Sequence, residues 1–191
     1  MNIENYEPIK GLTYKDLFEK QKELIFLYEP KEREVFENFD IDTYQDQEEF
    51  KKYCWRVTEE LTEALEAIDN LENTHVVEEM LDGFNFLVEL ISLYGFKFEK
   101  LDFSKTKIYK CTRDNILDIV ECLGLTANCL KNRAWRQSQY LVDLYIFEAR
   151  LNETFNLYLN VLRNLIGSDA KIIEQWSLKY QVNLFRIQTK Y

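Results

Sequence analysis

The chain has 191 residues, the length of one ordinary domain and short for two. Apolar residues make up 46% of the chain and aromatic residues 15%, which excludes a disordered acidic tail. The 34 acidic residues outnumber the 24 basic ones, and the net charge of −10 disfavours binding to nucleic acids or anionic membranes. One histidine and four cysteines without CxxC spacing disfavour a zinc site.

No apolar run approaches the ~20 residues that a transmembrane helix needs. The N-terminal residues also lack the basic and apolar regions of a signal peptide. The sequence therefore predicts a single domain over residues 1–191, in the cytoplasm and with neither a membrane nor a nucleic acid as partner.

Hydrophobic periodicity predicts an all-α helical bundle. The expected helices cover 13–28, 47–68, 75–94, 114–131, 138–166 and 169–187. Thr13 is the expected N-cap of the first helix, and Gly95 the residue that ends the third. The charged stretch 29–47 is expected to be a connector with at most a helical turn, and the polar stretch 96–112 a loop or short strands.

The sequence contains a weak internal repeat, which we call the internal echo. The segment 84–86 (Phe-Asn-Phe) resembles the segment 155–157 (Phe-Asn-Leu). In this alignment the acids of the first copy correspond to a base and an acid in the second, that is, Glu79 to Arg150 and Asp82 to Glu153. Two related helix pairs, one chemically active and one structural, would explain the echo. Chance similarity between amphipathic helices is the alternative.

Acidic residues border the apolar face of the helix expected over 47–68. Its apolar stripe consists of Val57, Leu61, Ala64, Leu65 and Ile68. At 100° per residue, Glu60 borders this stripe and Glu63 lies one turn further along the same flank, whereas Glu59 and Glu66 point away from it.

The helix expected over 75–94 carries two acids that point into the protein. Glu79 and Asp82 lie opposite its main apolar face, but Phe86 and Leu93 occupy that same opposite side. A surface helix would not place large apolar residues there. Buried carboxylates are costly unless they are paired or bind a cation.

Two such helices, joined by a short turn, can aim four carboxylates at one point: Glu60, Glu63, Glu79 and Asp82. Oxygen donors without histidine suit Mg²⁺ or Mn²⁺, which would neutralise a polyphosphate and activate a water molecule. The alternative is two ordinary charged helix flanks, because ExxE and ExxD spacings are common. The inward placement of the second pair leaves both interpretations open.

These residues resemble the all-α NTP pyrophosphatases and, within them, the dimeric dUTPases. The family signature of ExxE on one helix and ExxD on the next is matched by 60–63 and 79–82. A following D-x-[FW]-H-F pattern resembles 82–86 (Asp-Gly-Phe-Asn-Phe). The K-N-x-x-N-x-[FA]-R-Q-x-x-x-Y signature resembles 179–191, and an early LxxQKEL helix resembles 17–24.

The resemblance implies hydrolysis of a deoxynucleoside triphosphate, with dUTP as the expected substrate, to the monophosphate and pyrophosphate. It assigns Mg²⁺, or Mn²⁺, to Glu60, Glu63, Glu79 and Asp82. One of these, Glu60 or Glu63, would orient or deprotonate the attacking water. The phosphates would be bound by Lys179, Asn183 and Arg186. The base would be held by Gln21, Asn85 and a stacking Phe84.

Departures from the family pattern leave the base open. Tyr180 and Ile187 stand where the family has Asn and Gln, and Ile25 stands where many members have Asn. The alternatives to dUTP are therefore dCTP or another deoxynucleoside triphosphate. The basic segment 131–137 either contacts phosphate or forms a helix end with solvated cations.

Apolar residues on more than one face of the helices predict a homodimer. The aromatic residues within 140–158 are expected in the core or at the dimer interface. A non-catalytic helical protein that binds a partner in nucleotide metabolism is the alternative function, and turnover of nucleotides distinguishes the two.

Overall fold

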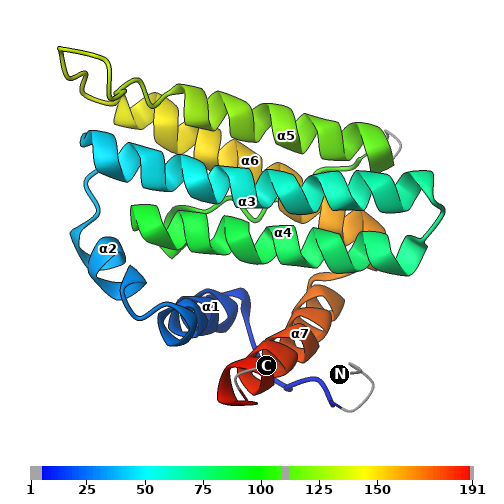
Figure 1. Ribbon diagram of the computed structural model, residues 1–191. Helices are drawn as coiled ribbons and strands as arrows, with labels where there is room; N and C mark the ends of the chain where they lie inside the picture. Colours follow the sequence, from blue (N-terminus) through cyan, green and yellow to red (C-terminus); the bar gives the residue numbers. More distant parts are fainter. Residues whose placement is uncertain (1–5, 109–111, 190–191) are drawn as a thin grey trace.

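The computed structural model describes residues 6–108 and 112–189, which form seven α-helices, one short 3₁₀-helix and no strand. The all-α class predicted from the sequence is therefore confirmed. Figure 1 shows the helices α1 (Tyr14–Tyr28), α2 (Glu32–Asn38), α3 (Tyr44–Asp69), α4 (Asn73–Tyr94), α5 (Thr112–Asn128), α6 (Leu144–Ile166) and α7 (Asp169–Thr189). Among the described residues, no helix is both long enough and apolar enough to cross a membrane.

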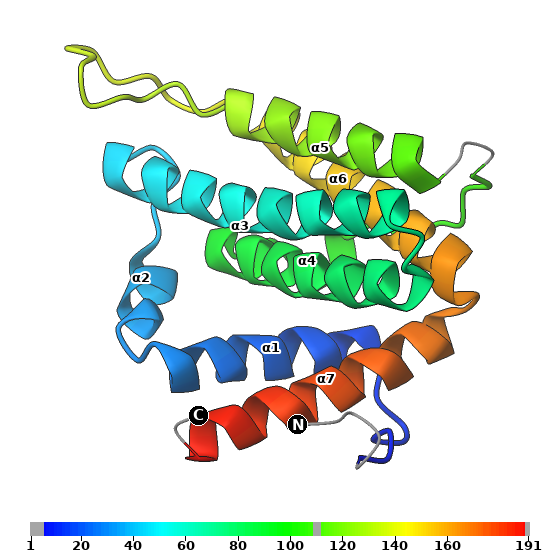
Figure 2. The ribbon, with the colours of Figure 1, turned by 45° about the vertical axis from the view of Figure 1, so that its right-hand side comes forward.

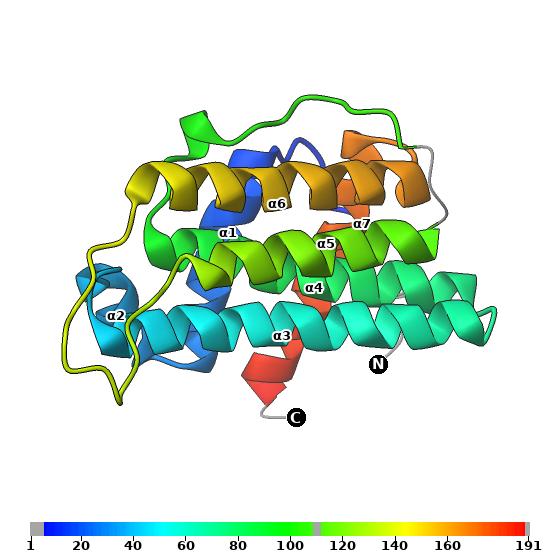
Figure 3. The same ribbon diagram turned by 90° about the horizontal axis from the view of Figure 1, so that it is seen from above.

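Four long helices, α3 to α6, form the main bundle. Helix α3 packs along α4, and α5 packs along α6, so the bundle consists of two helix pairs (Figure 3). Helices α1 and α7 lie side by side beneath α4 and form a second layer (Figure 2). The short α2 connects this layer to the bundle.

Local capping signals set two helix boundaries as the sequence predicts. The Thr13 side chain accepts a hydrogen bond from the Asp16 N–H, and the Asp16 carboxylate accepts one from the Thr13 N–H, which forms a capping box at the start of α1. Gly95 adopts φ of +74° at the end of α4, a left-handed conformation that glycine reaches without strain.

Other boundaries differ from the sequence prediction. The connector 29–47 contains the complete helix α2, and α3 begins at Tyr44 because Thr43 caps it. Helix α6 begins at Leu144 rather than at 138. The preceding loop, 129–143, is held away from helical geometry by Asn132, whose side chain bonds the backbone of Asp42 and Tyr140.

The stretch 96–108 is a loop with one 3₁₀ turn at Phe98–Lys100 and no strand. It runs along α6 (Figure 3), where two asparagines bind its backbone. Asn156 Nδ2 donates to the Asp102 carbonyl at 2.9 Å, and the Thr106 N–H donates to Asn160 Oδ1 at 3.0 Å. These side chains give the loop backbone hydrogen bonds that it would otherwise make to a neighbouring strand.

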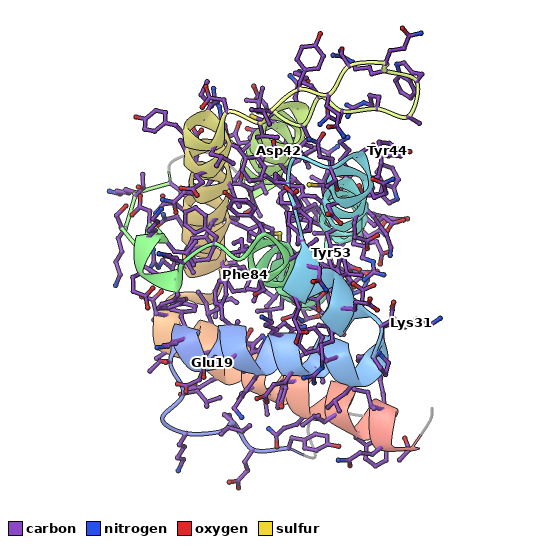
Figure 4. The ribbon with its side chains drawn as sticks, turned by 90° about the vertical axis from the view of Figure 1, so that its left-hand side faces the viewer. Glu19, Lys31, Asp42, Tyr44, Tyr53 and Phe84 are labelled. Carbon is purple, nitrogen blue, oxygen red and sulfur yellow. The ribbon has the colours of Figure 1, made fainter. Side chains whose placement is uncertain are left out.

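The two copies of the internal echo meet in the centre of the bundle. The rings of Phe84 and Phe155, which are aligned in the echo, stack at 6.2 Å, and Phe84 lies in the interior in Figure 4. In the second pair Arg150 and Glu153 form an ion pair at 2.8 Å where the first pair carries two acids. The relation between the two helix pairs stays a prediction.

Candidate functional site

Three carboxylates meet where α3 faces α4. Oxygens of Glu60, Glu79 and Asp82 all lie within 4.8 Å of one another. Gly83 permits this approach, because a Cβ there would lie 3.3 Å from Glu60 Cβ and would collide with the Tyr158 hydroxyl. We call these three side chains the acid cluster.

Burial makes the ionised state of the acid cluster unfavourable. It is the largest cause that raises the pKa of Glu60 to about 8, followed by a hydrogen bond shared with Glu79 and by repulsion from Asp82. Burial likewise raises the pKa of Glu79, which is 6% exposed, and the pKa of Asp82. The cluster therefore favours a bound cation or a bound proton.

Two basic side chains already contact the cluster. Lys179 Nζ lies 2.6 Å from Asp82 Oδ2 and 3.0 Å from Glu78 Oε1. Burial alone would lower the pKa of Lys179, but the charge and hydrogen bond of Asp82 raise it. His75 Nδ1 lies 3.0 Å from Glu79 Oε1. His75, expected near the start of its helix, thus lies three residues into α4 and pairs with an acid of the cluster.

The fourth predicted carboxylate lies outside the cluster. Glu63 is exposed one turn beyond Glu60 on α3. Its charge still contributes to the raised pKa of Glu60. Three of the four predicted carboxylates therefore converge, and the exposed Glu63 does not join them. Its assignment as a metal ligand stays a prediction.

The acid cluster opens into a cleft of about 400 Å³ between the bundle and the layer of α1 and α7. Most of the predicted site residues line it: Gln21 from α1, Glu60 from α3, Asp82 and Asn85 from α4, and Lys179, Asn183 and Arg186 from α7. Residues that lie up to 165 positions apart in the sequence are thus brought to one cavity, as a substrate site requires. Glu79 is buried behind this lining.

Phe84 does not reach the cleft. It is fully buried and packs on Phe155 and Tyr158, on the side of α4 that faces α6. The expectation that Phe84 stacks on a base is therefore corrected. Phe86 lines the cleft instead, with the Arg56 guanidinium 5.6 Å from its ring centre.

Sequence analysis missed three charged residues of the cleft, Glu29, Arg56 and Glu89. Glu29 is the C-cap of α1, and its Oε1 lies 3.7 Å from Arg56 Nη2. Arg56 lies one turn before Glu60 on α3, and Glu89 lies two turns after Asp82 on α4. Glu89 is buried and accepts a hydrogen bond from Gln21 Nε2 at 2.8 Å. An acid within the apolar run 86–93 was the available signal, since such an acid needs a specific partner.

One other motif lies away from the described cleft. The basic segment 131–137 is in the loop between α5 and α6, and none of its residues lines the cleft. It is not a helix end as one interpretation held, although Lys131 bonds Asn128 at the end of α5. The final two residues of the signature over 179–191 lie outside the described residues.

Comparison with known proteins finds no family model, curated protein or solved structure that matches this chain.

Proposed function

We propose that the protein is a Mg²⁺-dependent pyrophosphohydrolase that cleaves a deoxynucleoside triphosphate to the monophosphate and pyrophosphate. One observation carries the proposal: the acid cluster adjoins the same cleft that Lys179 and Arg186 of α7 line. A polyphosphate with bound cations needs this combination, since carboxylates bind the metal while lysine and arginine bind the remaining phosphate charge.

The donor set of the acid cluster suits a hard divalent cation. Glu60, Glu79 and Asp82 offer carboxylate oxygens within 4.8 Å of one another, and Mg²⁺ or Mn²⁺ prefers such ligands. The raised pKa values of these groups support the same assignment, because burial and, to a lesser extent, repulsion between acids raise them, and a bound cation would offset both. When bound, the metal would neutralise phosphate charge and lower the pKa of a bound water.

The side chains around the cluster then have distinct roles. Lys179 is held at the cluster by Asp82 and Glu78, and it would bind phosphate oxygens once the cation satisfies Asp82. Arg186 and Asn183 line the same wall of the cleft and would orient the phosphate chain. Glu60 and Asp82 are both half-buried acids that line the cleft, but Asp82 is paired with Lys179, so Glu60 is the one placed to orient the attacking water.

The base would lie further along α4, near Gln21 and Asn85. The resemblance to dimeric dUTPases favours dUTP, and the departures from the family pattern leave dCTP or another deoxynucleotide as alternatives. A cytoplasmic homodimer belongs to the same proposal. Exposed apolar residues on the 129–143 loop and the start of α6 support a second copy there, namely Trp135, Leu141, Leu144, Tyr145 and Ile146.

The test is pyrophosphate release from each of the common deoxynucleoside triphosphates, with Mg²⁺ and with a chelator. We expect turnover with Mg²⁺ alone, a loss of at least about 1000-fold in Glu79→Gln, and near wild-type rates in Glu59→Gln. Glu59 is the matched control, because it lies on the exposed side of α3. Absence of turnover in the folded wild-type protein would favour the non-catalytic binding protein instead.

A further inference from the structure

Two buried oxygen atoms in the wall of the cleft have no hydrogen-bond partner among the described residues. They are Asn85 Oδ1 and Glu89 Oε2, and each residue is only 6% exposed. The other oxygen of Glu89 accepts from Gln21 Nε2, which fixes the carboxylate in place. Buried acceptors without donors are rare in folded proteins because each loses its hydrogen bonds to water and gains none in return.

The two acceptors form one continuous strip with the acid cluster. Asn85 and Glu89 lie one helical turn apart on α4, and both line the cleft. Asp82 and Glu89 lie seven positions apart, which corresponds to about 10 Å along the helix axis. A ligand whose phosphates reach Asp82 can therefore place its other end against Asn85 and Glu89.

In the second helix pair, the positions aligned with Asn85 and Glu89 have hydrogen-bond partners. In the internal echo, Asn85 and Glu89 correspond to Asn156 and Asn160 on α6. There the loop 102–106 runs along the helix and supplies both a carbonyl acceptor and an N–H donor. In the first pair Gln21 donates to Glu89 Oε1. Asn85 Oδ1 and Glu89 Oε2 have no donor among the described residues.

We infer that Asn85 and Glu89 read a base that carries an exocyclic amino group, so that dCTP is preferred over dUTP. This inference rests on the proposed function. The amino group at C4 of cytosine offers two N–H donors, which suits the two acceptors. Uracil presents the carbonyl O4 at the same place, and its lone pairs would face the Glu89 carboxylate.

The experiment compares kcat/KM for dCTP and dUTP, two substrates that differ at this one edge of the base. It is run at about pH 8.5, above the pKa of about 7 that burial gives Glu89, so that its carboxylate is ionised. We expect a preference for dCTP of at least about 100-fold. In Glu89→Gln the amide can present either end, and the preference should fall below about 10-fold. Turnover of dATP, whose N6 amino group is the same donor, tests whether a purine also fits.

Glu32→Gln is the matched control. Glu32 is also a buried acid, 7% exposed, and it accepts from the Tyr53 hydroxyl outside the cleft. This variant should keep the wild-type preference. If Glu89→Gln retains the preference, the role of Glu89 is overturned.

Binding of the products dCMP and dUMP by calorimetry separates this inference from the proposed function. Turnover that favours dUTP, or that treats the two alike, overturns the inference and leaves the pyrophosphohydrolase intact. Tighter binding of dCMP without turnover of any nucleotide overturns the hydrolase and supports base recognition. Neither binding nor turnover overturns both.

Discussion

Replacement of Glu60 by glutamine should stabilise the metal-free protein while it impairs catalysis. Glu60 belongs to a cluster of three carboxylates, and burial and repulsion raise its pKa to about 8. The folded protein therefore holds a proton on Glu60 that the unfolded chain loses near pH 4.5. Glutamine keeps the shape of the side chain and removes the charge.

The size of this effect follows from the pKa of Glu60. A rise from 4.5 to about 8 corresponds to about 5 kcal/mol, at about 1.36 kcal/mol per pH unit. The side chain is only half-buried, and solvent screening reduces the expected gain to about 2 kcal/mol. The folded state binds more protons than the unfolded state between these two pH values, so wild-type stability falls as the pH rises through this window. The gain in Glu60→Gln therefore grows from near zero at about pH 4.5 to its full value above about pH 8.

Urea denaturation with excess chelator measures this difference, at about pH 5 and about pH 9. Glu59→Gln is the control, because Glu59 is exposed on the same helix and its removal should change stability by less than about 0.5 kcal/mol at either pH. A Glu60→Gln variant that is less stable than wild type at about pH 9, or whose gain is the same at both pH values, would refute the reasoning.

Three further predictions follow from the same contacts. Mg²⁺ at 100 times its dissociation constant should raise the free energy of unfolding of the wild type by about 2.7 kcal/mol. Glu79→Gln should lose this gain, and an equal gain in that variant would show that the metal binds at another site. Arg186→Ala should raise KM by about 10- to 100-fold and leave kcat within a few fold, measured by steady-state kinetics, since Arg186 lines the phosphate end of the cleft; unchanged kinetics would contradict this role. Gly83→Ala should cost about 1–3 kcal/mol in urea denaturation because its Cβ would collide with the Tyr158 hydroxyl; if the loss is no smaller when Tyr158→Phe is added, the collision is not its cause.

The sequence predicted those features that depend on local rules. Thr13 and Gly95 mark helix ends through their own backbone and side-chain chemistry, and the structure confirms both. The i, i+3 spacing of Glu79 and Asp82 likewise places both acids on one side of α4, whatever packs against it.

The features that sequence analysis missed depend on distant partners. Phe84 and Phe86 are both apolar, and only the position of α6 decides that Phe84 enters the core while Phe86 lines the cleft. Glu63 has the same sequence pattern as Glu60, but α3 exposes it to solvent. Glu89 acquires a role through Gln21, which lies 68 residues earlier in the chain.

The most direct test of the central claim is the identity of the phosphorus products. Incubation of dCTP and dUTP with the wild-type protein and Mg²⁺, followed by ³¹P NMR, should show pyrophosphate and a monophosphate as the first products. The same spectra with Glu79→Gln or with chelator should show intact triphosphate. Release of orthophosphate in place of pyrophosphate, or unchanged triphosphate with the folded wild-type protein, would contradict the account.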